Sequence, residues 1–425
     1  MAGAPQIRKV MKIINEQPAR KFVVVSAPGR RTPADRKITD LLLLCHELAK
    51  HEEKYDDVFA RVTERFTQIV EQLGINFDIG RELAEIKRLI HRQKSNDFAA
   101  SRGEYLMAKI MAAALGWPFI DASLIVRFDS SGRYDDVTTR NLAAGELKRY
   151  KNAVIPGFYG SLPTGDIRIF PRNYSDFSGA IIARAAKADV YENWSDQPGY
   201  RSAPPEFVSG SKPILTMTHE EMRELSAMGS SVIHHDTVLP LMESGIPIHL
   251  LNTHDPMDEG TLIVPKHKLE TPPPPVTGVT GMKGFSIVTV TKTGMDSEDG
   301  FARRLLEAFE DLHVGMKHFP TGMDVMSVVC PTEDIERCRK ALDEAIRVKC
   351  SPESIVVEDG LAIVAAVGRG MSKRRGTAAK FMKAVADADV NIRLISQGGS
   401  EMTILIGVDE TDLTKTANAV YRAFF

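Results

Sequence analysis

The sequence predicts an α/β protein in which a mostly parallel sheet is sandwiched by helices and is followed by two ferredoxin-like βαββαβ units. Short apolar runs alternate with helical patterns over residues 1–268, which is typical of a parallel sheet covered on both faces. Four consecutive prolines at 272–275 indicate a stiff linker, which we place at 269–278. Behind it, residues 279–357 and 358–425 repeat one order of strands and helices, so we expect one large domain and two smaller ones.

The composition limits the kinds of partner. A chain of 425 residues is long enough for two or three domains that each bury a core. The net charge of −2 gives no electrostatic reason to expect nucleic acid or an anionic membrane as a partner. The 4 cysteines lack CxxC spacing, no secretory signal opens the chain, and no apolar run approaches a membrane span. We therefore expect free thiols, a cytoplasmic location and small ligands, acidic ones included.

The first third of the chain is expected to be mainly helical. Apolar residues at helical spacing begin at Ile7, and a continuous apolar strand at 22–27 then runs into a proline-glycine turn, as in a buried parallel strand. A helical region follows over 37–114. Within it, the Ser-Arg-Gly-Glu segment at 101–104 is expected to start a long helix, where Glu104 either binds a ligand ammonium group or is a solvated acid stabilised by the helix dipole. From this segment alone the solvated acid is favoured.

The segment at 170–200 combines an anion-binding turn, a helix, a strand and a second polar turn. The polar turn at 172–176 precedes a small-residue helix, whose free N–H groups and positive dipole end favour a phosphate or a carboxylate. Arg172 adds a fork suited to a carboxylate, and Asp176 offers an oxygen to a lysine or, through water, to magnesium. A strand at 190–192 leads to the second turn, at the edge where α/β sheets bind ligands. Alternatively, this is an ordinary βα turn in which the arginine and the aspartate pair with each other.

The remaining elements complete the two parts of the chain. A strand and loop at 154–160 precede a hairpin turn, and a capping box at 218–221 opens a helix. His234-His235-Asp236 has no further ligand at useful spacing, so we predict a helix start there and no metal site. The two repeats are expected to contain strands at 285–292, 314–318, 325–329 and 354–357 with helices at 300–312 and 333–348, then strands at 361–367, 391–395 and 401–407 with helices at 376–388 and 412–425. Paired small domains behind a larger one indicate sensing rather than chemistry.

These motifs resemble those of the aspartate kinases, and the resemblance covers essentially the whole chain. No single motif is specific, but their order and spacing are. They comprise the strand at 23–27, the segments at 101–104, 172–176, 191–196, 221–229, 245–248 and 252–256, and, in the two repeats, Thr-Gly-Met-Asp at 321–324 and Gln-Gly-Gly-Ser-Glu at 397–401. The resemblance implies an amino-acid-kinase fold with two C-terminal ACT domains. It also implies an enzyme that phosphorylates the side-chain carboxylate of aspartate to 4-phospho-aspartate, the first step of lysine, threonine and methionine biosynthesis.

The resemblance also implies site residues. Aspartate is expected to bind through Arg172, which would hold its α-carboxylate, and Glu104, which would hold its ammonium group, beside Ser26, Ala27 and Thr32. The nucleotide-binding residues are expected to be Ser195, Asp196 and Tyr200, and the catalytic residues beside the transferred phosphoryl group Ser175 and Asp176. ATP with Mg²⁺ is the expected cofactor. The substrate carboxylate itself attacks the γ-phosphate. The enzyme is therefore expected to catalyse the transfer by positioning the reactants and neutralising their charge. The chain has no G-x-x-x-x-G-K-[ST] segment and is not a P-loop kinase.

Three departures from the family bear on activity. The family begins with a strand carrying Lys-Phe-Gly-Gly-Ser/Thr, whose lysine and backbone amides hold the phosphates. This strand is missing from the present sequence. Our hypothesis is that the true start of the protein lies upstream. Asn173-Tyr174 replaces the usual Gly-Gly, and Ala203-Pro204 stands where the family often has Asp-Pro. Each charge-stabilising donor is worth about 3 kcal/mol, so the alternative function is a catalytically impaired, amino-acid-sensing regulatory subunit of the same fold. A third candidate, an enzyme acting on glutamate or carbamate, is disfavoured by the paired ACT domains.

Aspartate kinases are commonly inhibited by lysine or threonine bound in the first ACT domain. The residues expected to line such a site here are Met295, Ser297, Gly300, Phe301, Thr321 and Asp324. The acid at Asp324 and the amides near Gly300 suit the ammonium and carboxylate ends of an amino acid, whereas Met295 and Phe301 also suit core packing. ACT domains usually pair across subunits, so we expect a homodimer in which the effector acts through the interface.

Overall fold

The computed structural model describes residues 1–93, 95–171, 175–230, 232–269, 273–372 and 374–425. They fold into two compact units: an N-terminal unit of residues 1–199 and 233–268, and a C-terminal unit of residues 200–232 and 269–425. The predicted domain boundaries at 268, 278 and 357 stay a prediction. The predicted boundaries assign the segment 200–232 to the large domain, whereas in the structure this segment is part of the compact C-terminal unit. No helix among the described residues is both long and apolar enough to cross a membrane.

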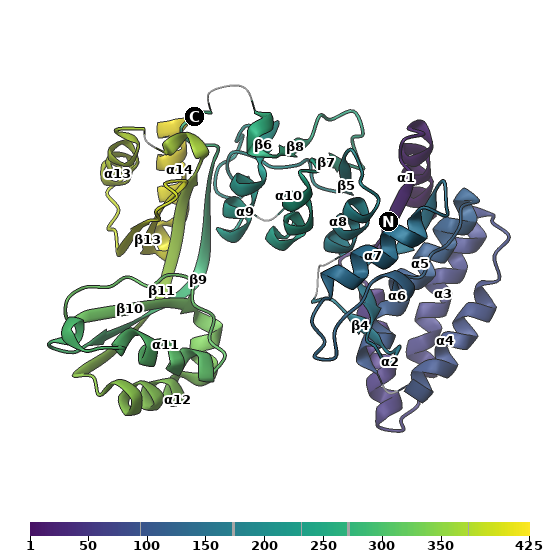
Figure 1. Ribbon diagram of the computed structural model, residues 1–425, viewed down its shortest axis with the longest axis horizontal. Coiled ribbons are helices and arrows are strands. Elements are labelled where there is room, and N and C mark those ends of the chain that lie inside the picture. The colour runs from purple at the N-terminus through teal and green to yellow at the C-terminus, as the bar shows by residue number, and fades with distance from the viewer. Residues whose placement is uncertain (94, 172–174, 231, 270–272, 373) are drawn as a thin grey trace. The chain divides into compact units, whose positions relative to one another are not determined.

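A bundle of helices forms one part of the N-terminal unit (Figure 1). It consists of α1 (Ala4–Glu16), α2 (Ile38–Lys50), α3 (Asp56–Leu73), α4 (Ile79–Gln93) and α5 (Asn96–Leu115). These helices direct apolar residues at i, i+3 and i+4 spacing into one core, which includes Leu42, Phe66 and Met107. The expected helical region is therefore confirmed, and large aliphatic and aromatic side chains form its core.

Helix α5 begins earlier than the sequence analysis expects. The side chain of Ser95 accepts a hydrogen bond from the backbone N–H of Phe98 and so caps the helix at its start. Glu104 consequently lies in the interior of α5, where it is 5% exposed. The interpretation of Glu104 as a solvated acid in a first helical turn is therefore wrong.

Two parallel strand pairs lie in the N-terminal unit, as predicted. β1 (Phe22–Val25) pairs with β2 (Ala153–Pro156), and β5 (Tyr191–Ser195) pairs with β7 (Ile248–Asn252). The hairpin β3 (Tyr159–Ser161) to β4 (Ile167–Ile169) and the strand β8 (Thr261–Val264) beside β7 are antiparallel. The helical elements around these strands are α6 (Ala122–Ile125), α7 (Asp136–Leu147), α8 (Ser175–Ala185), η1 (His235–Val238), α10 (Leu239–Ser244) and η2 (Lys266–Lys268). A second core, with Tyr159, Phe170 and Ile181, lies where strand and helix side chains meet.

The C-terminal unit contains one five-stranded antiparallel sheet in the order β10-β9-β11-β13-β12. Its strands are β9 (Gly278–Thr291), β10 (Val325–Pro331), β11 (Ser354–Val367), β12 (Leu394–Gln397) and β13 (Thr403–Asp409). β9 and β11 have 14 residues each, and Figure 1 shows them as long arrows that pass through both halves of the sheet. The strands predicted at 354–357 and 361–367 are thus one strand with a register shift near Gly360, where φ is +76°.

The helices of the C-terminal unit follow the predicted repeat. They are η3 (Met295–Ser297), α11 (Phe301–Asp311), α12 (Thr332–Cys350), η4 (Arg369–Met371), α13 (Thr377–Asp387), η5 (Glu410–Asp412) and α14 (Leu413–Phe424). The strand predicted at 314–318 is wrong, because this segment forms only an isolated bridge between His318 and Val329. α9 (His219–Ala227) contacts β9 and β11 and opens with the predicted capping box between Thr218 and Glu221, and the short strand β6 (Thr216–Thr218) precedes it.

Candidate functional site

The carboxyl ends of β1 and β2 meet the start of α8. The N–H of Gly157, just after β2, donates to the carbonyl of Val25, the last residue of β1, at 2.9 Å. A Cβ on Gly157 would lie 3.3 Å from the Cβ of Ser175 and 3.3 Å from that carbonyl, so a larger residue would crowd both. Ser26 and Ala27 follow β1 directly. The structure therefore brings these predicted substrate residues close to the predicted catalytic residue Ser175.

Phe158 follows Gly157 with a strained backbone. Its φ is +78°, in a region that bulky residues rarely adopt, and the side chain is 6% exposed. Its N–H donates to the hydroxyl of Ser178 at 2.9 Å, and its carbonyl accepts from the N–H of Phe170 at 2.9 Å. Such strain, held by its surroundings, is common at functional sites. The sequence analysis missed Phe158, for which the flanking glycines 157 and 160 are the available signal.

Glu104 points from the middle of α5 toward Ala27. A Cβ on Gly103 would lie 2.9 Å from the Cβ of Ala27, so only glycine lets α5 approach the loop after β1 this closely. Burial raises the pKa of Glu104 to about 7, while hydrogen bonding to the backbone of Ala27 and the charge of Arg102 act in the opposite direction. Within the described chain, Oε2 of Glu104 is buried without a hydrogen-bond partner. A buried carboxylate with one oxygen unpaired is suited to a ligand ammonium group.

A buried arginine next to this acid is enclosed by aromatic rings. The guanidinium of Arg102 lies 4.5 Å from the ring centroids of Phe98 and Tyr105 and 5.1 Å from that of Tyr159. Its Nε and Nη2 donate to the hydroxyl of Ser101 at 3.1 and 2.9 Å. The rings hold the cation in one orientation, so a fixed positive charge lies beside the candidate ammonium site. Sequence spacing alone did not reveal this arrangement.

Asp176 is tied to β5 from the first turn of α8. Asn193 Nδ2 donates to Asp176 Oδ1 at 2.9 Å, and the Tyr191 hydroxyl donates to the Asp176 carbonyl at 3.1 Å. Burial raises the pKa of Asp176, and the hydrogen bond from Asn193 and the nearby His234 oppose this rise. Tyr191 fits over α8 because a Cβ on Gly179 would lie 2.4 Å from its hydroxyl oxygen. The sequence analysis found Asp176 but missed Asn193 and Tyr191.

Ser195 and Asp196 lie at the carboxyl end of β5, beside the end of β7. The carbonyl of Ser195 accepts from both the N–H and the hydroxyl of Thr253, each at 2.8 Å. Burial lowers the pKa of the Met1 amine, and the charge of Asp196 opposes this shift. The Asp196 carboxylate therefore lies near the Met1 amine. The Met1 carbonyl in turn accepts from the N–H of Gly29 at 3.1 Å. The predicted nucleotide residues of this unit and the loop after β1 therefore lie in one region.

The remaining predicted site residues are Arg172, Thr32 and Tyr200. Arg172 lies outside the described residues. Thr32 is exposed, and its carbonyl accepts from the N–H of Asp35 at 3.1 Å. Tyr200 belongs to the C-terminal unit, where its side chain is fully buried and its hydroxyl lies 2.7 Å from that of Ser226. The nucleotide-binding role of Tyr200 stays a prediction.

His234, His235 and Asp236 form the expected start of a helix. Their ligand atoms lie within 4.8 Å of one another, and the two imidazole rings stack at 4.3 Å. His234 Nδ1 accepts the N–H of Asp236 at 3.3 Å and so caps η1. One nitrogen of this cluster is therefore already used, and the absence of a metal site there stays a prediction.

The predicted effector residues divide into buried and exposed positions of the C-terminal unit. Met295 and Phe301 are each 1% exposed and belong to the core beneath α11. Ser297, Gly300 and Thr321 are exposed, and Gly300 has φ +73° at the start of α11. Asp324 Oδ1 accepts the N–H of Gly294 at 2.7 Å, so this acid already binds the turn after β9. The effector role of these positions stays a prediction.

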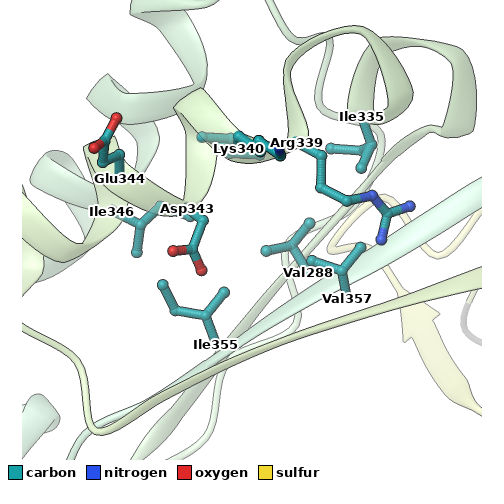
Figure 2. Close-up of a pocket in the computed structure, with 10 residues that line it drawn as sticks. Val288, Ile335, Arg339, Lys340, Asp343, Glu344, Ile346, Ile355 and Val357 are labelled. Atoms are coloured by element: carbon teal, nitrogen blue, oxygen red, sulfur yellow. The ribbon is translucent and has the colours of Figure 1, made fainter.

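A cavity of about 490 Å³ lies between α12 and the strands β9 and β11 (Figure 2). Its lining combines apolar residues of the sheet, such as Ile355 and Val357, with charged residues of α12, such as Arg339 and Asp343. Arg339 is held by Asp359 at 2.7 Å, and Asp343 by Arg347 at 2.7 Å. The predicted effector residues do not line this cavity.

Comparison with known proteins gives consistent results along the whole chain. The amino acid kinase family matches residues 1–252, and the ACT domain matches residues 364–424. Aspartokinase 3 of Bacillus subtilis is 33% identical over 443 residues, which cover 100% of this chain and 96% of that protein. The crystal structure of the aspartate kinase of Clostridium acetobutylicum is 40% identical with a TM-score of 0.95, covering 100% and 98% of the two chains. The structure of Escherichia coli aspartokinase III with aspartate and ADP shares the fold, with 22% identity, a TM-score of 0.80, and 100% and 97% coverage.

Proposed function

The chain belongs to the amino acid kinase family and, within it, to the aspartokinases, and we propose that the residues clustered at β1, α5 and α8 bind aspartate and Mg-ATP for phosphoryl transfer. The activity is ATP-dependent phosphorylation of the side-chain carboxylate of aspartate. The observation that carries the site assignment is Glu104, a buried acid beside the loop after β1 with one oxygen that has no partner among the described residues.

On the aspartate side, Glu104 receives the substrate ammonium group. Arg172 then holds the α-carboxylate with its planar fork. Ser26, Ala27 and Thr32, on the loop after β1, line the same side. With both ends of the amino acid held, only the side-chain carboxylate is free to reach the phosphoryl donor, and this orientation lowers the barrier by an entropic effect.

On the nucleotide side, the start of α8 receives the phosphates. Its positive dipole end favours the charge of the transferring group, next to Ser175. Asp176 uses Oδ1 for Asn193, and its carboxylate is suited to a water of the magnesium ion that enters with ATP. Ser195 and Asp196 contact the nucleotide. Mg²⁺ neutralises charge on the β- and γ-phosphates when it is bound.

In the reaction, an oxygen of the aspartate side chain forms a bond to the γ-phosphorus. The bond between this phosphorus and the oxygen that bridges to the β-phosphate breaks, and ADP carries that electron pair away. The chain's own residues orient the aspartate carboxylate and the γ-phosphate of ATP and provide positive potential along the line of transfer. The products are 4-phospho-aspartate and ADP, and a covalent enzyme intermediate is not required.

The C-terminal unit supplies regulation in this proposal. Lysine or threonine binds the first repeat at the positions around Gly300 and Asp324, and a homodimer formed through the ACT domains transmits the effect. The 4 cysteines are free thiols, which supports the expected reducing cytoplasm.

The test is L-aspartate-dependent ADP formation from Mg-ATP, with the acyl phosphate trapped as a hydroxamate. We expect turnover with aspartate and background rates with glutamate or carbamate. Comparing the three substrates therefore separates an aspartate kinase from an enzyme that acts on glutamate or carbamate. If aspartate supports no turnover while lysine or threonine raises the melting temperature, the chain is the sensing subunit instead.

A further inference from the structure

Arg65 is a buried arginine that binds two separate segments. It projects from the middle of α3 and is 6% exposed. Its Nη2 donates to the carbonyls of Ala2 at 2.5 Å and Gly29 at 2.6 Å, and its Nη1 donates to Asp35 Oδ2 at 3.2 Å. A single guanidinium therefore joins the first residues of the chain to the loop between β1 and α2.

The loop from 26 to 37 has no regular secondary structure and is closed around Asp35. The backbone N–H of Arg31 and its Nε both donate to Asp35 Oδ2 at 2.9 Å. The N–H of Asp35 donates to the carbonyl of Thr32 at 3.1 Å. Hydrogen bonding to Arg31 lowers the pKa of Asp35, so this carboxylate stays ionised at neutral pH. The loop is thus one folded unit, and Arg65 is its contact with the helical bundle.

A purely structural role does not require a cation at this position. The neighbouring core residues of α3 are apolar and include Val62, Phe66 and Ile69. Burial lowers the pKa of Arg65, which records the cost of removing its charge from water. Two carbonyls and one carboxylate offset that cost. An apolar residue would pack here without that cost, so the contribution specific to the arginine is the three acceptors that it holds.

We propose that Arg65 is a positioning residue for aspartate binding, because it fixes the loop that carries Ser26, Ala27 and Thr32 against the helical bundle. The inference rests on the proposed function, since it assumes that this loop lines the aspartate side. It assigns to Arg65 an indirect role, because the side chain acts through Gly29 and Asp35 and does not touch the substrate.

The experiment compares the variants Arg65→Met, Arg65→Lys and Asp35→Asn with the unsubstituted protein. Methionine replaces the aliphatic part of the side chain but has no donors, so we expect the KM for aspartate to rise by about ten- to a hundredfold, as for other small misplacements of a binding group. The kcat and the KM for Mg-ATP stay within about threefold. Arg65→Lys keeps the positive charge on a single donor nitrogen and restores part of the affinity. The matched control is Arg61→Met, an exposed arginine one turn earlier on α3, which leaves all three constants unchanged.

Two further measurements make the outcome decisive. Aspartate-induced stabilisation in thermal unfolding, measured on the same variants, reports binding even where turnover is slow. Ser26→Ala and Thr32→Val test the loop itself. If these two raise the aspartate KM while Arg65→Met does not, the Arg65 inference is wrong. If neither they nor Arg65→Met changes aspartate binding, the loop is not the aspartate side, and that part of the proposed function is wrong. An equal loss of affinity for aspartate and Mg-ATP would instead indicate a general structural defect.

Discussion

Asn193 on β5 donates its side-chain amide to Asp176 on α8 across 2.9 Å. The pair joins the strand whose end carries Ser195 and Asp196 to the helix whose start faces the loop after β1. The same amide lies 3.1 Å from the Tyr191 hydroxyl, which in turn binds the Asp176 backbone. Two side chains therefore hold Asp176, whose carboxylate is proposed to bind a water of the magnesium ion that enters with the nucleotide.

Asn193→Ala is expected to lower kcat by about ten- to a hundredfold, because a hydrogen bond to a charged group contributes about 1.5–3 kcal/mol. Without the amide, the pKa of the buried Asp176 rises further, and the carboxylate is less available to the metal-bound water. The aspartate KM should change little. Steady-state kinetics at several magnesium concentrations provide the check, and an unchanged kcat would show that Asp176 does not need this partner.

Glu104→Gln is expected to raise the aspartate KM by about ten- to a hundredfold, since the charge-assisted bond to the ammonium group is lost. Folding stability should not fall, because the variant removes a buried charge of which one oxygen has no partner in the described chain. Kinetics combined with thermal unfolding test both statements. A strong loss of stability with an unchanged KM would make Glu104 a structural residue.

The same residue predicts a pH dependence. Burial raises the pKa of Glu104 from 4.5 to about 7, so the folded state binds a proton more tightly than the unfolded state does. Stability should therefore fall as the pH rises from about 4.5 to 7, by up to about 3 kcal/mol from this group. Ammonium binding needs the ionised form, so the aspartate KM should fall as the pH rises through 7. Glu104→Gln should remove both slopes, and parallel slopes in the two proteins would contradict the assignment.

Gly179→Ala is expected to destabilise the fold by about 1–3 kcal/mol, because its Cβ would lie 2.4 Å from the Tyr191 hydroxyl oxygen. Gly145→Ala is the matched control. Gly145 also lies inside a helix, α7, where a Cβ meets nothing within 4 Å, and alanine is favoured over glycine there by about 1 kcal/mol. Thermal or urea unfolding compares the two. Equal melting temperatures would show that Tyr191 can move away from α8.

A local pattern was sufficient to single out Asp176, an acid at the start of a small-residue helix. The roles of Ser26 and Ala27 were implied by the family resemblance, and the structure places both directly after β1. The assignment of Asp176 depends on residues that are adjacent in the chain, where hydrogen-bonding and packing preferences are local. The same approach wrongly predicted a solvent-exposed Glu104. An exposed acid in a first helical turn and a buried acid in a helix interior can have the same local sequence pattern.

The sequence by itself determined most of the segments that form strands and helices and which residue types follow the strands. Tertiary structure alone decided that Glu104 is buried against Ala27, that Asn193 and not a lysine binds Asp176, that Arg65 holds the loop after β1, and that the two repeats share the strands β9 and β11. The physical reason is distance along the chain. Each of these contacts joins residues far apart in sequence, and whether they meet depends on strand register and helix packing, which no local periodicity specifies.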